Sequence, residues 1–223
     1  MIKVISYCLF GQSPKYCVGA IRNAELAKEV YPEWEPWFFC GTSVPTQILL
    51  NIENTNKKAR IILMDKSGGH EMMLDRLRPS LDDDVECFIS RDTDSRFSKR
   101  EKFAVDEWLA SDKTWHTMHA HFWHSVPILG GMFGVKKRGF TNLWNLAENW
   151  QKSTEARWQQ DQDFLTQVIW PKIKDDVLNH ADFHTNIWPG KSFPVPMEPG
   201  HFIGATYDEN NKIDKLQLER LYG

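Results

Sequence analysis

Residues 85–96, Val-Glu-Cys-Phe-Ile-Ser-Arg-Asp-Thr-Asp-Ser-Arg, form an apolar segment that stops at two carboxylates separated by one residue. The apolar part is rich in strand formers and predicts a β-strand. Side chains at the end of such a strand point into the crevice above the sheet, where ligands of open α/β folds bind. Asp92 and Asp94 at that point can hold a hard divalent cation through oxygen ligands and leave other coordination positions for phosphate oxygens. The alternative is a solvated Asp-Thr-Asp-Ser turn after an edge strand.

Arginines surround this acidic pair in the sequence, at positions 76, 78, 91 and 96. The planar guanidinium group makes bidentate bonds to phosphate. We expect Arg76 and Arg91 to contact the phosphates of a nucleotide, and Arg76 is favoured because its predicted helix leads into the acidic strand. The alternative for each arginine is a solvated surface charge.

The composition excludes several classes of function. The chain has 223 residues, of which 41% are hydrophobic, so it is long enough for one sizeable core. A net charge of -3 argues against a general nucleic-acid-binding protein. No apolar stretch approaches the roughly 18 residues of a membrane span. The four cysteines have no Cys-x-x-Cys spacing and are expected to be reduced, buried thiols, which favours a soluble protein of the cytoplasm.

Strands and helices alternate through the first hundred residues, which predicts a mainly parallel sheet with helices on both faces. We expect one domain over residues 1–223. Expected strands are 2–9, 37–40, 60–64, 85–91 and 180–183. A first helix is expected between the turn at residues 10–14 and Pro32. Further helices are expected at 45–52, 72–77, 98–109, 141–151 and 161–169.

Residues 10–16, Phe-Gly-Gln-Ser-Pro-Lys-Tyr, form the first strand-to-helix turn, where a doubly wound fold usually binds a nucleotide. The turn has neither the Gly-x-Gly-x-x-Gly fingerprint nor the Walker pattern, which disfavours a Rossmann dehydrogenase and a P-loop NTPase. We expect Phe10, Gly11 and Tyr16 to contact the nucleotide; the alternative is that Gly11 serves only the turn and Tyr16 only packs.

Two further groups lie late in the chain. Asp161 and Asp163 open a predicted helix, where the helix dipole favours acids, or one of them faces a reacting sugar carbon or accepts a proton from an attacking hydroxyl. The His184 imidazole could supply a third ligand to the cation held by the acidic pair, and Lys191 could reach a diphosphate as a point charge.

A histidine-rich segment contains His116, His119, His121 and His124. Aromatic residues interrupt any clean helical face, and no His-Glu-x-x-His motif occurs. A zinc site is therefore disfavoured relative to a polar lining of a substrate pocket or ordinary loop histidines.

These motifs, and the order in which they follow one another along the chain, resemble those of nucleotide-sugar glycosyltransferases of the GT-A fold. The resemblance is to the small glycosyltransferase domains of chloroviruses and related large DNA viruses in particular. The resemblance extends from residue 4 to about residue 197 and rests mainly on segments 7–11, 19–24, 91–96 and 130–132. It implies a single-domain GT-A fold, a UDP-type sugar donor such as a UDP-glucose-like one, Mn²⁺ or Mg²⁺, transfer to a glycan or protein-linked hydroxyl, and, for a viral protein, the host cytoplasm.

Residue by residue, the resemblance assigns the metal to Asp92 and Asp94, and the turn beside the donor sugar to Gly130 and Gly131. The helix start beside the sugar matches Asp163, with Asp161 as the neighbouring candidate.

His184 and Lys191 resemble a His…Gly-x-Lys element of retaining enzymes, although the spacing between them is looser here. Two other functions remain open: a metal-dependent nucleotidyl- or phosphotransferase, and a carbohydrate-binding domain without catalysis.

Overall fold

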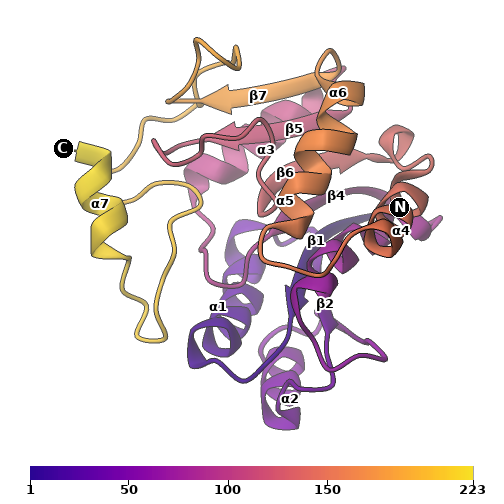
Figure 1. Cartoon of the computed structure of the whole chain (residues 1–223). Coiled ribbons are helices and arrows are strands. Elements are labelled where there is room, and N and C mark those ends of the chain that lie inside the picture. Colours follow the sequence, from indigo (N-terminus) through magenta and orange to yellow (C-terminus); the bar gives the residue numbers. More distant parts are fainter. Residues whose placement is uncertain (223) are drawn as a thin grey trace.

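A seven-stranded sheet forms the centre of the molecule in the computed structural model, which describes residues 1–222 (Figure 1). The strand order is β3-β2-β1-β4-β6-β5-β7. The strands are β1 (Ile2–Leu9), β2 (Trp34–Cys40), β3 (Arg60–Leu63), β4 (Val85–Arg91), β5 (Trp115–His119), β6 (Met132–Lys136) and β7 (Val177–Ala181). Strand β6 runs antiparallel to both β4 and β5, and the other neighbouring pairs are parallel. The predicted mainly parallel α/β sheet is confirmed.

Helices cover both faces of this sheet. The α-helices are α1 (Pro14–Val30), α2 (Thr46–Thr55), α3 (Lys99–Ala110), α4 (Leu143–Ser153), α5 (Gln160–Phe164), α6 (Trp170–Ile173) and α7 (Lys215–Tyr222). Two 3₁₀ segments, η1 (His70–Leu81) and η2 (Lys137–Gly139), and one π turn, η3 (Leu165–Ile169), complete the helical elements of the described chain. Within these residues, no helix is both long and apolar enough to cross a membrane.

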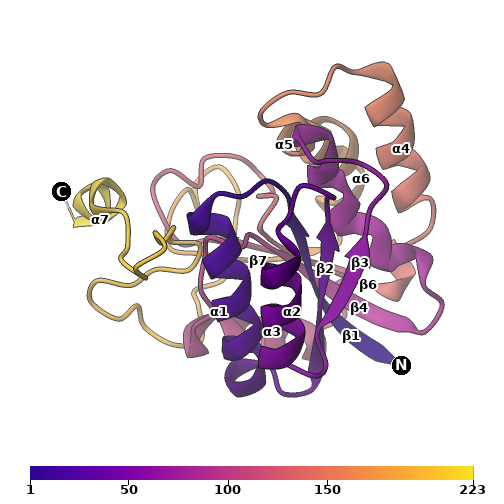
Figure 2. The same cartoon turned by 90° about the horizontal axis from the view of Figure 1, so that it is seen from below.

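The two helical layers follow from the alternation of side chains along the strands. Figure 2 shows α1, α2 and α3 on one face, with α4, α5 and α6 on the other. On β1, Ile5, Tyr7 and Leu9 pack on the side of α1, whereas Val4 and Cys8 pack on the side of η1. Burying a side chain of this size contributes about 1.5–3 kcal/mol, so a central strand that is covered on both faces is apolar along most of its length.

Most expected elements of the first hundred residues are present within a few residues of their predicted limits. Helix α3 begins after Ser98, whose side chain accepts a hydrogen bond from the Glu101 amide at 3.1 Å. All four cysteines are buried and unpaired, as expected.

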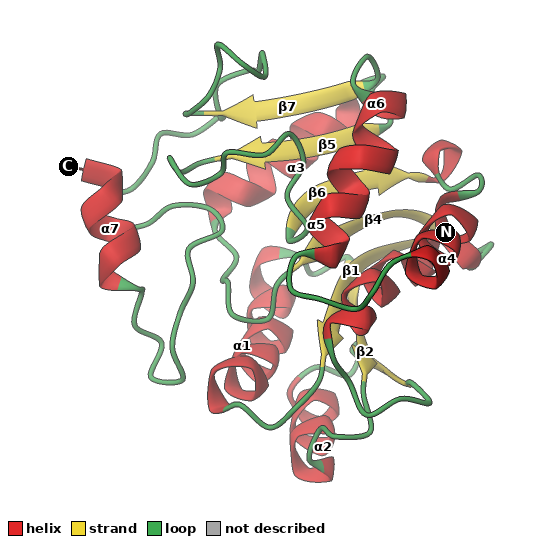
Figure 3. Cartoon of the chain, viewed as in Figure 1, coloured by secondary structure: helices red, strands yellow, loops and turns green. Residues whose placement is uncertain are grey.

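Three predictions for the secondary structure were wrong in detail. The segment expected as a short helix at 72–77 is the longer 3₁₀ element η1. The histidine-rich segment contains strand β5, which was not predicted, and the late strand lies at Val177–Ala181 instead of 180–183. Between β7 and α7 the chain consists mostly of loops, seen in green in Figure 3.

Candidate functional site

A pocket of ≈ 480 Å³ lies where β1 and β4 end and β6 begins. Residues 8–10 and 92–95 follow these first two strands, and residues 129–132 lead into β6. Side chains of η1 and of the segment 158–162 contribute to the opposite wall. The carboxyl ends of parallel strands and the start of an antiparallel one meet at the same sheet edge, which brings together segments far apart in sequence.

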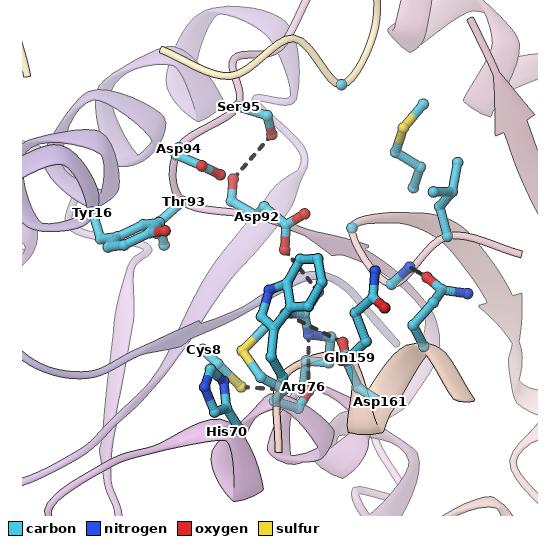
Figure 4. A pocket seen from close by; sticks show the side chains of 18 of the residues that line it. Cys8, Tyr16, His70, Arg76, Asp92, Thr93, Asp94, Ser95, Gln159 and Asp161 are labelled. Carbon is cyan, nitrogen blue, oxygen red and sulfur yellow. Dashed lines mark hydrogen bonds and ion pairs between the residues drawn. The ribbon is translucent and has the colours of Figure 1, made fainter. Parts of the chain in front are cut away.

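Asp92 is the first residue after β4, and its carboxylate points into this pocket (Figure 4). Its backbone carbonyl accepts hydrogen bonds from the Ser95 amide and hydroxyl, which closes the turn that holds the acidic pair. One carboxylate oxygen, Oδ1, accepts a hydrogen bond from Arg76 Nη1 at 2.9 Å. The loop geometry therefore presents the carboxylate at the rim of the sheet, as predicted for this residue.

Arg76 is fixed at the base of the pocket. Its side chain is only 3% exposed, and its Nε donates to the Met73 carbonyl at 2.9 Å. Burial lowers the pKa of this guanidinium, but the neighbouring carboxylates of Asp92 and Asp161 outweigh burial, so its pKa is raised overall. Arg76 is thus a permanent, rigid positive charge beside the acidic pair.

Asp94 also lines the pocket but pairs with a different basic side chain, that of Lys15. Its Oδ2 lies 2.8 Å from Lys15 Nζ, at the start of α1. Burial raises the pKa of the Asp94 carboxyl and the negative charge of Asp92 raises it further, whereas Lys15 acts in the other direction. Each acid of the pair is therefore neutralised by its own basic side chain.

Asp161 and the glycine turn form a third part of the site. Burial raises the pKa of Asp161, while Arg76, whose Nη2 lies 3.9 Å from its Oδ2, opposes this increase. A Cβ added to Gly130 would lie 2.8 Å from Asp161 Oδ2, and one added to Gly131 would lie 2.1 Å from Asp92 Oδ2. Both carboxylates therefore lie against bare backbone, which only glycine allows at this distance.

The first turn of the chain forms another side of the pocket. Phe10 and Tyr16 line it, and the Tyr16 ring is half-exposed. Gly11 has a left-handed φ of 72° and its amide donates to Ser43 Oγ at 2.8 Å, so its observed role is to form the turn. Burial raises the pKa of the Cys8 thiol at this wall to about 12, which makes it a neutral hydrogen-bond donor and not a nucleophile at neutral pH.

Five residues predicted for the site do not line this pocket: Gly11, which forms the turn described above, and Arg91, Asp163, His184 and Lys191. Arg91 precedes Asp92 on the strand, so its side chain points to the other face of the sheet, where its Nε bonds Glu101 Oε1 at 2.7 Å. Asp163 pairs with Arg157 outside the pocket lining, whereas its neighbour Asp161 lies inside. His184 Nε2 bonds the carbonyl of Phe122 at 2.6 Å and Lys191 pairs with Glu107.

Residues that were not predicted for the site also line or contact the pocket, among them Lys15, Trp158 and Gln162. The Gln162 amide holds the glycine turn, with its Oε1 accepting from the Gly130 amide at 3.1 Å and its Nε2 donating to the Ile128 carbonyl. The sequence could have indicated Gln162, because it lies between Asp161, which lines the pocket, and Asp163. Trp158 is 70% exposed although it lines the pocket, a feature that a sequence pattern does not indicate.

His124 is the only one of the four clustered histidines that lines this pocket. Its Nδ1 accepts a hydrogen bond from the Ala120 amide at 3.0 Å. Burial lowers the pKa of this imidazole well below its usual value, so the ring is neutral and the proton is on Nε2. That tautomer makes His124 a hydrogen-bond donor and disfavours it as a metal ligand.

The charges and donor atoms of the pocket suit a hard divalent cation. Three carboxylates, those of Asp92, Asp94 and Asp161, oppose the two basic side chains of Arg76 and Lys15. Among the described residues, no three His, Cys, Asp or Glu side chains gather in a geometry that could hold a metal. A cation here would therefore bind Asp92 and Asp94 and complete its coordination with water and phosphate oxygens, as Mg²⁺ commonly does.

No protein-family model and no curated protein sequence matches the chain. Among solved structures, it is similar to a glycosyltransferase involved in the glycosylation of the major capsid of PBCV-1, with a TM-score of 0.55 and 14% identity over 81% of this chain and 82% of that one. It is equally similar to 4-diphosphocytidyl-2C-methyl-D-erythritol synthase from Anaerococcus prevotii, with a TM-score of 0.55 and 14% identity over 86% and 91% of the two chains.

A third similar structure is the mannosyltransferase PcManGT from Pyrobaculum calidifontis in complex with GDP-Man and Mn²⁺. It has a TM-score of 0.52 and 14% identity, over 81% of this chain and 55% of that one. These likenesses confirm the predicted GT-A fold. At such low identity they establish the fold alone.

Proposed function

We propose that this protein is a metal-dependent glycosyltransferase that moves a sugar from a UDP-type nucleotide sugar to a hydroxyl group of a glycan or a glycosylated protein. One observation above all supports the proposal. The Asp92 carboxylate, the buried Arg76 and the Asp161 carboxylate converge beside a turn of two glycines. That arrangement combines groups for a diphosphate with an open backbone surface on which a sugar ring can lie.

The nucleotide would bind at the first turn of the chain. Phe10 and the half-exposed ring of Tyr16 offer apolar surface to the base and ribose. Arg76 would then stabilise the negative charge that develops on the leaving diphosphate, since it is fixed in place before the reaction and costs no reorganisation. A divalent cation held by Asp92 and Asp94 would supply further positive charge for this diphosphate.

Asp161 is the proposed group beside the reacting sugar. It lies against Gly130 and near Arg76, so a sugar attached to the diphosphate would extend along the glycine turn toward it. Its carboxylate would orient the acceptor hydroxyl or stabilise positive charge on the sugar ring. Gln162 would keep the glycine turn in place through its two hydrogen bonds.

The acceptor would approach past Trp158. This side chain belongs to the wall that carries Asp161, and most of its surface is exposed. The backbone two residues further on is tied to helix α4, because the Gln160 carbonyl accepts a hydrogen bond from Trp150 Nε1 at 3.2 Å. An exposed indole in the lining of a polar pocket suits the apolar face of a sugar ring.

The test is turnover of UDP-sugars to UDP with Mn²⁺, measured across several donors with and without candidate glycans. We expect the Asp92→Ala variant to lose at least about 10²-fold in turnover and to keep its melting temperature. The matched control is Asp65→Ala, an exposed acid outside the pocket lining. Undiminished turnover of Asp92→Ala at saturating Mn²⁺ would contradict the proposal.

A nucleotidyltransferase is the second candidate, because the synthase from Anaerococcus prevotii has the same fold at the same TM-score as the capsid glycosyltransferase. Such an enzyme would bind a nucleoside triphosphate and a sugar phosphate. Thermal shift with UTP compared with UDP-sugars separates the two. Stabilisation by UTP plus a sugar phosphate, together with pyrophosphate release, would favour the second candidate, and binding of glycans without any turnover would favour a carbohydrate-binding domain.

A further inference from the structure

Both acids of the Asp-x-Asp pair are bound by basic side chains, which come from two different elements, η1 and α1. Asp92 Oδ1 bonds Arg76 Nη1 at 2.9 Å, and Asp94 Oδ2 lies 2.8 Å from Lys15 Nζ. The lysine ammonium therefore binds one of the two carboxylate oxygens through which Asp94 would bind a metal cation.

The two basic side chains differ in their freedom to move. Arg76 is buried and is held by the Met73 carbonyl as well as by two carboxylates. The Lys15 side chain is 35% exposed, and Asp94 is the only carboxylate within 4.0 Å of its ammonium in the described part of the chain. Its other close contact is the Tyr16 ring, whose centroid lies 5.4 Å from Nζ. Lys15 has a flexible four-carbon stem, so it can leave Asp94 while Arg76 stays in place.

An ammonium and a divalent cation cannot both bind the same carboxylate oxygens at contact distance, because like charges repel strongly in a partly dehydrated site. Resting on the function proposed above, we propose that Lys15 is an exchangeable counter-cation of Asp94. It neutralises the acid in the empty pocket, is displaced when the divalent cation binds, and then contacts the diphosphate of the donor. Its place beside Tyr16, at the wall where the nucleotide would bind, puts the displaced ammonium within reach of such phosphates.

The consequence is that removing this lysine has opposite effects on two ligands. In Lys15→Met, Mn²⁺ no longer competes with a hydrogen-bonded ammonium, so Mn²⁺ binding without nucleotide should tighten by about tenfold. UDP binding at saturating Mn²⁺ should weaken several-fold, because one positive charge next to the phosphates is lost. A purely structural lysine would weaken both or change neither.

The experiment is titration of free Mn²⁺ by electron paramagnetic resonance, followed by calorimetric titration of UDP at saturating Mn²⁺. Lys28→Met, an exposed lysine at the other end of helix α1, is the matched control and should leave both affinities unchanged. Lys15→Arg keeps the charge and should resemble the wild type in Mn²⁺ affinity. Melting temperatures of all variants establish that each is folded.

Each outcome has one meaning. Equal or weaker Mn²⁺ binding by Lys15→Met, with normal binding by the wild type, overturns the exchange and leaves the proposed function intact. Unchanged UDP affinity overturns the contact with the diphosphate. If neither the wild type nor Lys15→Met binds Mn²⁺, both the exchange and the metal-dependent function fail.

Discussion

Replacing Gly131 with alanine tests the geometry of the pocket with a single methyl group. The added Cβ would lie 2.1 Å from Asp92 Oδ2 and 2.5 Å from its carboxyl carbon. Non-bonded atoms of this kind do not approach closer than about 3 Å, so the carboxylate must move by about 1 Å. It can do so, because the Asp92 side chain is half-exposed and lies at the rim of the pocket.

The displaced carboxylate would leave Arg76 and the position that it shares with Asp94. A misplacement of about 1 Å at a reacting centre costs on the order of 10²-fold in rate. We therefore expect kcat/KM for UDP-sugar turnover to fall by about that factor in Gly131→Ala, with little change in the melting temperature. The assay is steady-state release of UDP in Mn²⁺, combined with thermal unfolding.

Gly134, in strand β6 three residues after Gly131, supplies the matched control. A Cβ there would lie 2.9 Å from the Trp108 ring in the core, away from the pocket. Gly134→Ala should therefore lower the stability by about 1–3 kcal/mol and leave kcat/KM of the folded protein unchanged. A Gly131→Ala variant within about twofold of the wild type in kcat/KM, or one that loses stability instead of activity, would refute the reasoning.

Three further predictions concern other groups. Burial raises the pKa of Asp161 in the folded state, so its ionised form costs stability above its unfolded pKa of about 3.9. Asp161→Asn should thus raise the melting temperature at pH 7, and this gain should shrink as the pH falls toward 4, while transfer is lost; a lower melting temperature at pH 7 would contradict the assignment. Trp158→Ala should raise the KM for the acceptor several-fold and leave the KM for the donor and the melting temperature nearly unchanged, as measured by initial rates with each substrate varied. His184→Ala should keep turnover within about twofold of the wild type, because its imidazole bonds the Phe122 carbonyl away from the pocket. A large loss of turnover in this variant would show that His184 acts in the site after all.

The fold could be predicted from the sequence where burial on both faces makes a strand apolar throughout. Strands β1 and β4 are of this kind, and both were found at nearly their observed limits. Strand β5 was missed because two of its five residues are histidines and a third is a threonine, so it lacks an apolar run. Its His116 is buried and bonds His180 of β7 at 2.8 Å, so the polar groups that hid the strand are satisfied by a partner 64 residues away.

The candidate site was predictable in part for a related reason. Asp92 follows a strand, so its position at the sheet edge follows from where the strand ends. Arg91 precedes it, and side-chain alternation directs Arg91 to the opposite face, where it meets Glu101 of α3. Lys191 pairs with Glu107, and Lys15 pairs with Asp94. Each of these ion pairs joins segments about 80 residues apart in the sequence. Such partners depend on the tertiary fold, and no local pattern indicates them.

The reversed direction of β6 also governs when the pocket can form. Because β6 opposes β4, the residue after β4 and the residue before β6 are neighbours, and Ser90 Oγ bonds the Gly130 carbonyl across the two strands at 2.6 Å. A slip of two residues in this pairing would carry the glycines about 7 Å away from Asp92. During synthesis from the amino terminus, the acidic turn is therefore completed some forty residues before its other wall exists. A nascent chain that stops short of β6 would have half a sheet and no place for a ligand.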